Sequence, residues 1–124
     1  MPVLRSCLIF VLLAMPAFAA PPPRAAAEIQ QLIAALGSSG CDFERNGRWY
    51  PSAKAQEHLQ RKYDWLRERG KAATAEQFIE LAGTRSSMSG RAYRVRCKGR
   101  PVVGSAQWLG DRLREMRRHD APAR

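Results

Sequence analysis

Four stretches of the chain place apolar residues at the spacing of an α-helix. The first, residues 25–36, has a stripe that repeats at i, i+3, i+4 and i+7, and Gly37 follows it as a typical end residue. The longest, residues 53–69, ends at Gly70 and carries a second line of His58, Lys62 and Trp65 beside its apolar one. The expected buried residues of these two helices are Ile29, Leu32, Ile33, Leu36, Ala55, Leu59, Tyr63 and Leu66.

The other two helices are expected in the second half of the chain. Thr74 and Gln77 form a capping box, in which Thr74 accepts a hydrogen bond from the Gln77 backbone while Gln77 reaches back. Gly83 ends this helix, and Ser105 is expected to cap the last one after a turn at 99–104. The expected buried residues are Phe78, Leu81 and Ala82 in the first of the two, and Ala106, Leu109, Leu113 and Met116 in the second.

Alternating patterns predict short strands at 41–45, 48–50 and 92–98. Asn46-Gly47 separates the first two, and both residues accept positive φ, which indicates a two-residue hairpin. In the third strand Tyr93, Val95 and Cys97 share one face, while the other face carries Arg94, Arg96 and Lys98. The chain is therefore expected to be α+β, a small antiparallel sheet of two or three strands with about four helices packed on one face.

The N-terminus has the layout of a secretory signal peptide, residues 1–19. Arg5 precedes an apolar run that is too short for a membrane span, and small residues place the cleavage site after Ala19, with Ala20 as the alternative. A proline-rich leader (20–24), a single α+β domain (25–118) and a frayed tail (119–124) would follow. We expect an exported protein with no transmembrane segment after cleavage.

Cleavage would remove Cys7 and leave Cys41 and Cys97. An even pair in an exported chain predicts one disulfide, because the compartment outside the cytoplasm is oxidising. Antiparallel pairing of 41–45 with 92–98 would direct both cysteines to the same side. Two free buried thiols are the alternative.

The formal net charge is +10, with 21 Lys and Arg against 11 Asp and Glu. Such a charge usually indicates nucleic acid binding, but export argues against nucleic acid as the physiological partner. The expected partners are anionic envelope components, such as a wall polymer or a lipid head group, or an acidic protein. No pair of residues has zinc-ligand spacing, so we expect neither metal nor cofactor.

The serine loop, residues 84–90, is the main candidate site. Hydroxyls, turn amides and guanidinium groups together suit phosphate or carboxylate. The candidate ligand-binding residues are Arg85, Ser86, Ser87, Ser89, Gly90, Arg91, Tyr93 and Arg94. Arg45, Asn46 and Tyr50 would join them if the hairpin lies beside the loop, and a second basic patch consists of Arg112, Arg114, Arg117 and Arg118. A solvated arginine face and a purely structural loop are the alternatives.

Two other functions compete with anion binding. A small serine hydrolase could pair a loop serine with His58, although the G-x-S-x-G elbow is absent. Ser89-Gly90-Arg91-Ala92-Tyr93 also resembles the S-G-x-x-Y loop of bacterial lysozyme inhibitors, which implies an inhibitor of a wall-degrading enzyme. Those inhibitors are mostly β-proteins, whereas this chain is substantially helical.

Three blocks of the sequence together resemble the YfeK-like family of small exported bacterial proteins whose function is uncharacterised. The blocks are CDFERNGRWY, AQEHLQRKYDWL and TAEQFIELAGTRSSMSGRAYRV, in matching order and spacing. The resemblance implies a periplasmic setting and a compact α+β domain, and it brings no catalytic or binding residues. We therefore expect a periplasmic binding protein rather than an enzyme.

Overall fold

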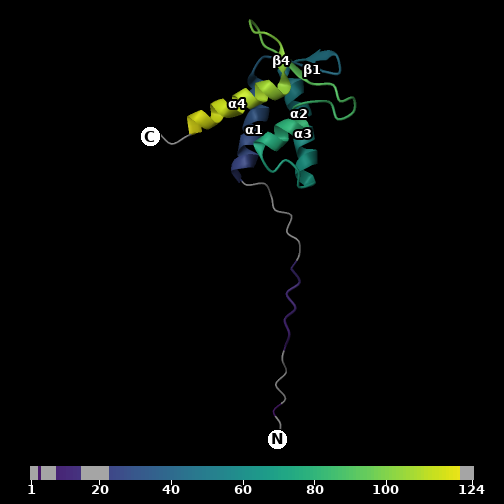
Figure 1. The fold of residues 1–124 in the computed structure, drawn as a ribbon, viewed down its shortest axis with the longest axis vertical. Helices are drawn as coiled ribbons and strands as arrows, with labels where there is room; N and C mark the ends of the chain where they lie inside the picture. Colours follow the sequence, from purple (N-terminus) through teal and green to yellow (C-terminus); the bar gives the residue numbers. More distant parts are fainter. Residues whose placement is uncertain (1–2, 4–7, 15–22, 121–124) are drawn as a thin grey trace.

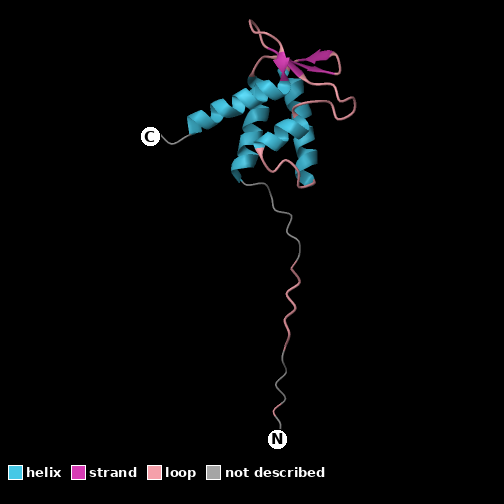
Figure 2. Ribbon diagram, in the orientation of Figure 1, coloured by secondary structure: helices cyan, strands magenta, loops and turns pink. Residues whose placement is uncertain are grey.

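The computed structural model describes residues 3, 8–14 and 23–120. Cys7, Ala19 and Ala20, and therefore the expected cleavage site, lie outside these residues. No helix in the described part is both long and apolar enough to cross a membrane. The described residues form four helices and a four-stranded sheet, with the strands gathered at one end of the helical layer (Figures 1 and 2).

Four antiparallel strands form the sheet, in the order β2-β1-β3-β4. The strands are β1 (Asp42–Arg45), β2 (Arg48–Tyr50), β3 (Arg94–Arg96) and β4 (Val103–Gly104). The predicted α+β class is confirmed, with one strand more than expected. Val103 pairs with Val95 inside the segment that we expected to be only a turn. The expected third strand is also shorter, because Ala92 forms only an isolated bridge with Arg85.

The hairpin and the cysteine bridge form as the sequence predicts. Asn46 and Gly47 both have positive φ, and they connect β1 to β2 through the pair Arg45 and Arg48. Cys41 and Cys97 form a disulfide with a Cα–Cα distance of 4.4 Å. The register explains this closeness. Asp42 pairs with Arg96 in an antiparallel ladder, so Cys41, just before Asp42, lies opposite Cys97, just after Arg96.

Four helices provide most of the core. They are α1 (Pro23–Ser38), α2 (Ser52–Glu68), α3 (Ala75–Ala82) and α4 (Ser105–Asp120). The apolar stripes predicted for α1 and α2 are buried in full, and Leu109 and Leu113 are buried in α4, with Ala106 and Met116 half-buried. Tyr93 and Val95 are also buried, so the apolar face of β3 lies against the helices as expected.

Three helix details differ from the sequence prediction. Gly37 does not end α1, which continues to Ser38; a Cβ at Gly37 would lie within 2.0 Å of the Gln56 side chain, so the glycine allows α2 to approach closely. Leu81 is 46% exposed, because the buried line of α3 passes through Ala75, Phe78 and Ala82 instead. The Ser105 hydroxyl makes no hydrogen bond within the described residues; its backbone N–H donates to the Tyr93 carbonyl.

The capping box of α3 is present with one change of partner. The Thr74 hydroxyl accepts a hydrogen bond from the Gln77 backbone at 3.1 Å. The Gln77 side chain reaches back to the N–H of Ala73, not of Thr74, at 2.8 Å. The two bonds fix the entry into α3 and thereby the position of the serine loop that follows Gly83.

Candidate functional site

Ser86 uses its hydroxyl to build the serine loop. The residue is 5% exposed, and its Oγ accepts hydrogen bonds from the backbone N–H groups of Met88 and Ser89 at 3.3 and 3.2 Å. The Ser86 backbone closes the loop, since its N–H donates to the Arg91 carbonyl and its carbonyl accepts from Gly90. Gly90 has φ +74°, which suits glycine at this turn. The Ser86 hydroxyl is therefore committed to local structure.

The hairpin lies beside the serine loop, as the sequence analysis considered. Asn46 donates to Ser86 Oγ at 3.4 Å and accepts a hydrogen bond from Ser89 Oγ at 2.5 Å. Ser89 Oγ also accepts from the backbone N–H of Arg91 at 3.2 Å. Two of the three loop hydroxyls thus connect the loop to itself and to the hairpin, and only the exposed Ser87 hydroxyl makes no hydrogen bond within the described residues.

Most of the arginine face of β3 is neutralised by β1. Arg94 forms a two-pronged ion pair with Glu44 at 2.9 and 2.8 Å, and this bond holds the pKa of Glu44 below its usual range. Arg96 pairs with Asp42 at 3.1 Å. Both pairs follow from the strand register, which places each acid of β1 opposite the arginine of β3. Arg85 and Arg91 are exposed and form no ion pair within the described part of the chain.

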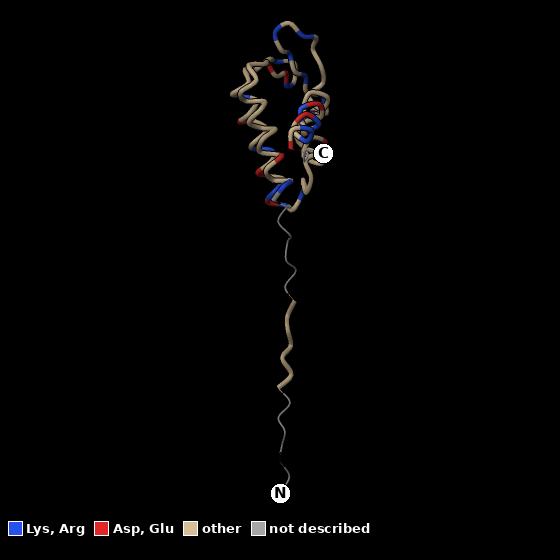
Figure 3. The backbone as a smooth tube through the Cα atoms, turned by 90° about the vertical axis from the view of Figure 1, so that its left-hand side faces the viewer, with Lys and Arg blue, Asp and Glu red and all other residues tan. Residues whose placement is uncertain are grey.

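The second basic patch, on α4, is largely paired as well. Figure 3 shows acidic residues interleaved with basic ones along this helix. Arg112 pairs with Glu115 and Arg114 with Asp111, one turn away in each case. Arg117 contacts both Glu28 of α1 and Glu76 of α3, so it connects three helices. Arg118 alone of the four patch arginines forms no ion pair among the described residues.

His58 lies at the centre of a different cluster, which sequence reasoning did not assemble. Its Nδ1 accepts a hydrogen bond from the Arg45 guanidinium at 3.0 Å, and its Nε2 lies 3.0 Å from the Tyr93 hydroxyl. A guanidinium group can only donate, so Nδ1 is the acceptor and the hydrogen resides on Nε2, which donates to Tyr93. Both ring nitrogens are thus occupied, and neither bonds to a serine of the loop.

Burial and neighbouring cations keep His58 neutral. Burial contributes most, followed by the charges of Arg45, Lys62 and Arg61, and together they lower the pKa of His58 to about 4. The ring is also stacked at 5.6 Å against Tyr93, edge to face. With a pKa of about 4 and its unprotonated Nδ1 bonded to Arg45, His58 is a weak base and is poorly suited to general-base catalysis near neutral pH.

Lys62 is the second perturbed group of the cluster. Its Nζ donates to the Tyr93 hydroxyl at 3.2 Å and to the Arg85 carbonyl at 3.0 Å. Burial, followed by the charge of Arg45, lowers the pKa of Lys62 to about 8. Burial likewise raises the pKa of Tyr93. Tyr93 was a candidate ligand-binding residue, but its side chain is 1% exposed and its hydroxyl is shared between His58 and Lys62.

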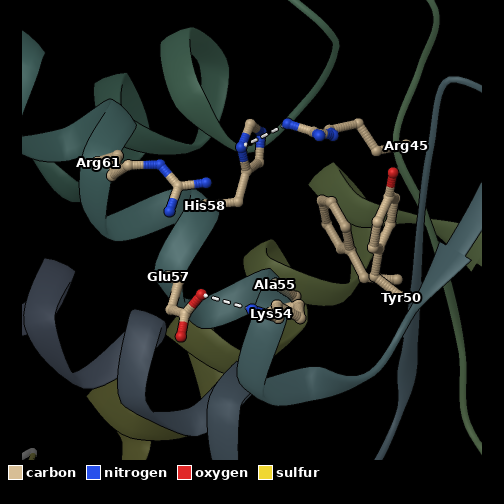
Figure 4. A pocket seen from close by; sticks show the side chains of 8 residues that line it. Arg45, Tyr50, Lys54, Ala55, Glu57, His58 and Arg61 are labelled. Carbon is tan, nitrogen blue, oxygen red and sulfur yellow. Dashed lines mark hydrogen bonds and ion pairs between the residues drawn. The ribbon is translucent and has the colours of Figure 1, made fainter.

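Arg45, His58 and Arg61 line two adjacent pockets. One has a volume of about 180 Å³ and is bordered by Tyr50 and by the ion pair of Lys54 with Glu57. In Figure 4, Arg45 and Arg61 lie on opposite sides of the His58 ring. The other pocket, of about 450 Å³, extends past Lys62 towards α3 and the serine loop.

The arrangement brings β1, α2 and the serine loop together around one cationic site. Arg45 was expected only as a conditional neighbour of the loop, and Arg61 was not expected there at all. The line His58, Lys62 and Trp65 on α2 was the available signal, because a polar line beside a buried stripe must lie at the edge of the core. The described residues contain no group of three or more His, Cys, Asp or Glu side chains that could hold a metal ion.

Comparison with known proteins identifies the family. Residues 23–117 match the model of DUF5329, a family of unknown function. The chain belongs to this family. The matched segment runs from the start of α1 nearly to the end of α4, so it includes the disulfide and all residues of the cationic site. Neither the curated proteins nor the solved structures contain a significant match.

Proposed function

We propose that this DUF5329 protein is an exported binding protein that holds an anionic ligand at the cationic site formed by Arg45, Arg61 and Lys62. One observation carries the proposal. These three side chains converge around His58, and none forms an ion pair with a carboxylate within the described residues. The nearby carboxylate of Glu57 pairs with Lys54.

The physical argument concerns electrostatic repulsion. Burial contributes most to the lowered pKa of both His58 and Lys62, and the positive charge of Arg45 lowers both further, so Arg45 lies where it disfavours a positive charge on either group. Several other arginines of the described residues are paired with carboxylates, as with Arg94 and Arg117. An anion at the site would relieve this repulsion and gain charge-assisted hydrogen bonds from guanidinium groups.

The serine loop, expected from the sequence to bind the ligand, is instead proposed to support the site. Ser86 and Ser89 hold the loop against Asn46, and Arg94 is paired with Glu44. Arg85, Ser87 and Arg91 remain exposed. We therefore infer that the loop forms one wall of the site, with Ser87 lining it, and that the α2 and β1 cations bind the ligand.

The geometry gives less support to the two competing functions. A hydrolase would need His58 to bond to a serine, yet its ring nitrogens face Arg45 and Tyr93. An inhibitor that inserts the S-G-x-x-Y loop would need an accessible Tyr93, which is buried.

The proposed location is the periplasm. It rests on the signal-like N-terminus, on the resemblance of three sequence blocks to the YfeK-like proteins, and on the disulfide, which is typical of oxidising compartments. The proposed physiological partner is an anionic envelope component, a polymer, a lipid head group or an acidic protein.

A titration with inorganic phosphate, followed by NMR at His58, tests the site. Phosphate should shift the His58 ring signals and raise the His58 pKa, because a bound anion favours the charged imidazole. Arg61→Gln should weaken binding at least about fivefold, and added salt should do the same. Arg118→Gln is the matched control and should leave binding unchanged. Equal binding by wild type and Arg61→Gln would exclude the proposed site.

A further inference from the structure

The larger pocket has two chemically distinct sides. Arg45, Arg61 and Lys62 line one side together with His58. Trp65, Leu66 and Leu81 line the other. Its volume of about 450 Å³ is within the range of small-molecule sites. A pocket with a cationic side and an apolar side is suited to a ligand that has an anionic group and an apolar group.

Trp65 and Leu81 are large apolar residues that remain about half exposed at the edge of the pocket. Trp65 is 50% exposed and Leu81 is 46% exposed, although α2 and α3 pack against each other. The Arg69 guanidinium, which also pairs with Glu68, lies 3.9 Å from the centre of the Trp65 ring. Met88, which follows the pocket-lining Ser87, is 97% exposed at the loop tip. An exposed apolar rim around a cationic pocket is typical of a binding surface rather than of packing.

We propose that this pocket binds an anionic amphiphile, with its charged head at Arg45, Arg61 and Lys62 and its apolar chain across Trp65 and Leu81. This inference rests on the proposed function and names the ligand class. Charge complementarity selects the head, since a cationic ligand would be repelled and a neutral one would leave the cations without a counter-charge. The chain removes the exposed faces of Trp65 and Leu81 from water.

Alkyl phosphates of increasing length, kept as monomers in solution, provide the test. Binding to the whole protein is measured by calorimetry with inorganic phosphate, butyl phosphate and octyl phosphate, and with octyl glucoside as the neutral control. Each methylene that leaves water can strengthen binding by up to about fourfold. We expect octyl phosphate to bind at least about tenfold more tightly than inorganic phosphate, and octyl glucoside to bind far more weakly.

Two pairs of variants locate the head and the chain. Leu81→Gln should remove most of the octyl advantage and leave phosphate binding intact, whereas Arg61→Gln should weaken both phosphates. Val102→Gln and Arg118→Gln are the matched controls, because neither residue lines the pocket: Val102 is 41% exposed on a loop and Arg118 lies on α4. Both controls should bind as wild type does. Circular dichroism confirms that each variant is folded.

The outcomes separate this inference from the proposed function. Equal affinity for inorganic and octyl phosphate would overturn the amphiphile while leaving the anion site in place. Equal loss of the octyl advantage in Leu81→Gln and Val102→Gln would also overturn it. Failure of both phosphates to bind would reject the proposed function and the inference together.

Discussion

Arg45 of β1 donates a hydrogen bond to Nδ1 of His58 of α2 at 3.0 Å, and this contact sets the electrostatics of the site. A guanidinium beside the ring requires Nδ1 to remain unprotonated. The hydrogen on Nε2 is then directed to Tyr93, which also accepts a hydrogen bond from Lys62. Arg45 thus determines the tautomer of His58 and, after burial, is the next cause that lowers the pKa of both His58 and Lys62.

The first prediction concerns pH. The folded pKa of His58, about 4, is lower than the unfolded value of 6.5. Between these values the unfolded chain binds more protons, so the stability due to neutral His58 is complete above pH 6.5 and is lost as pH falls towards 4. The His58→Gln variant should show a smaller loss of thermal stability between pH 7 and pH 4.5 than wild type.

His119→Gln serves as the control for the pH experiment. Carboxylates such as Glu28 and Glu44 also titrate at low pH, so only the difference between wild type and variant reports His58. His119 is exposed near the end of α4, so its replacement controls for the loss of a histidine outside the site. Identical profiles for all three proteins would mean that folding does not lower the pKa of His58.

The second prediction concerns the structural role of the loop serines. Ser86→Ala removes the buried acceptor for two backbone N–H groups and should lower the free energy of unfolding by about 1 kcal/mol. Ser87→Ala removes an exposed hydroxyl with no bond in the described structure and should change it by less than about 0.5 kcal/mol. Urea unfolding measures both, and equal stabilities would contradict the loop geometry.

The third prediction uses two glycines near α4. A Cβ at Gly83 would lie 2.5 Å from Cδ1 of the buried Leu109, so Gly83→Ala should destabilise the fold by about 1–3 kcal/mol through overpacking. A Cβ at Gly110, inside α4, would make only an ordinary contact, 3.6 Å from the Arg114 side chain. Gly110→Ala should stabilise by about 0.5–1 kcal/mol through helix propensity. Shifts of the same sign would contradict the packing of α3 on α4.

The fourth prediction concerns the disulfide. The bridge joins residues 56 positions apart, for which the chain-entropy model gives about 4 kcal/mol of stabilisation. Replacing Cys41 and Cys97 together by serine should lower the free energy of unfolding by a few kcal/mol, and reduction of the wild type should give a similar loss. Mass spectrometry of the protein purified without reductant checks the bond directly. Free thiols at Cys41 and Cys97 under these conditions would contradict the bridge.

Local signals account for most of the correctly predicted fold. Two of these signals are fixed backbone periods, as in the stripe of Ile29 and Leu32 and in the alternation of Tyr93, Val95 and Cys97. The third is the positive φ of the Asn46-Gly47 turn. The helix of Leu81 was also predicted, but its exposure was not, because the neighbours of a short helix decide which of its apolar residues are buried. The strand at Val103 was missed for a related reason, since two residues carry no periodic pattern and need Val95 as a partner.

The sequence by itself determined the helices, the hairpin, the faces of the main strands and the cysteine pair, because these follow from backbone geometry over a few residues. Only the tertiary structure decided which charges remain unpaired. Arg94 meets Glu44 through strand pairing, whereas Arg45 bonds to His58 and shares a pocket with Arg61 only because β1 packs beside α2. Electrostatic energies depend on distances between segments that are remote in sequence, so the sequence pattern could not locate the unpaired cations. The proposed ligand-binding groups are therefore the cations beside the serine loop, not its hydroxyls.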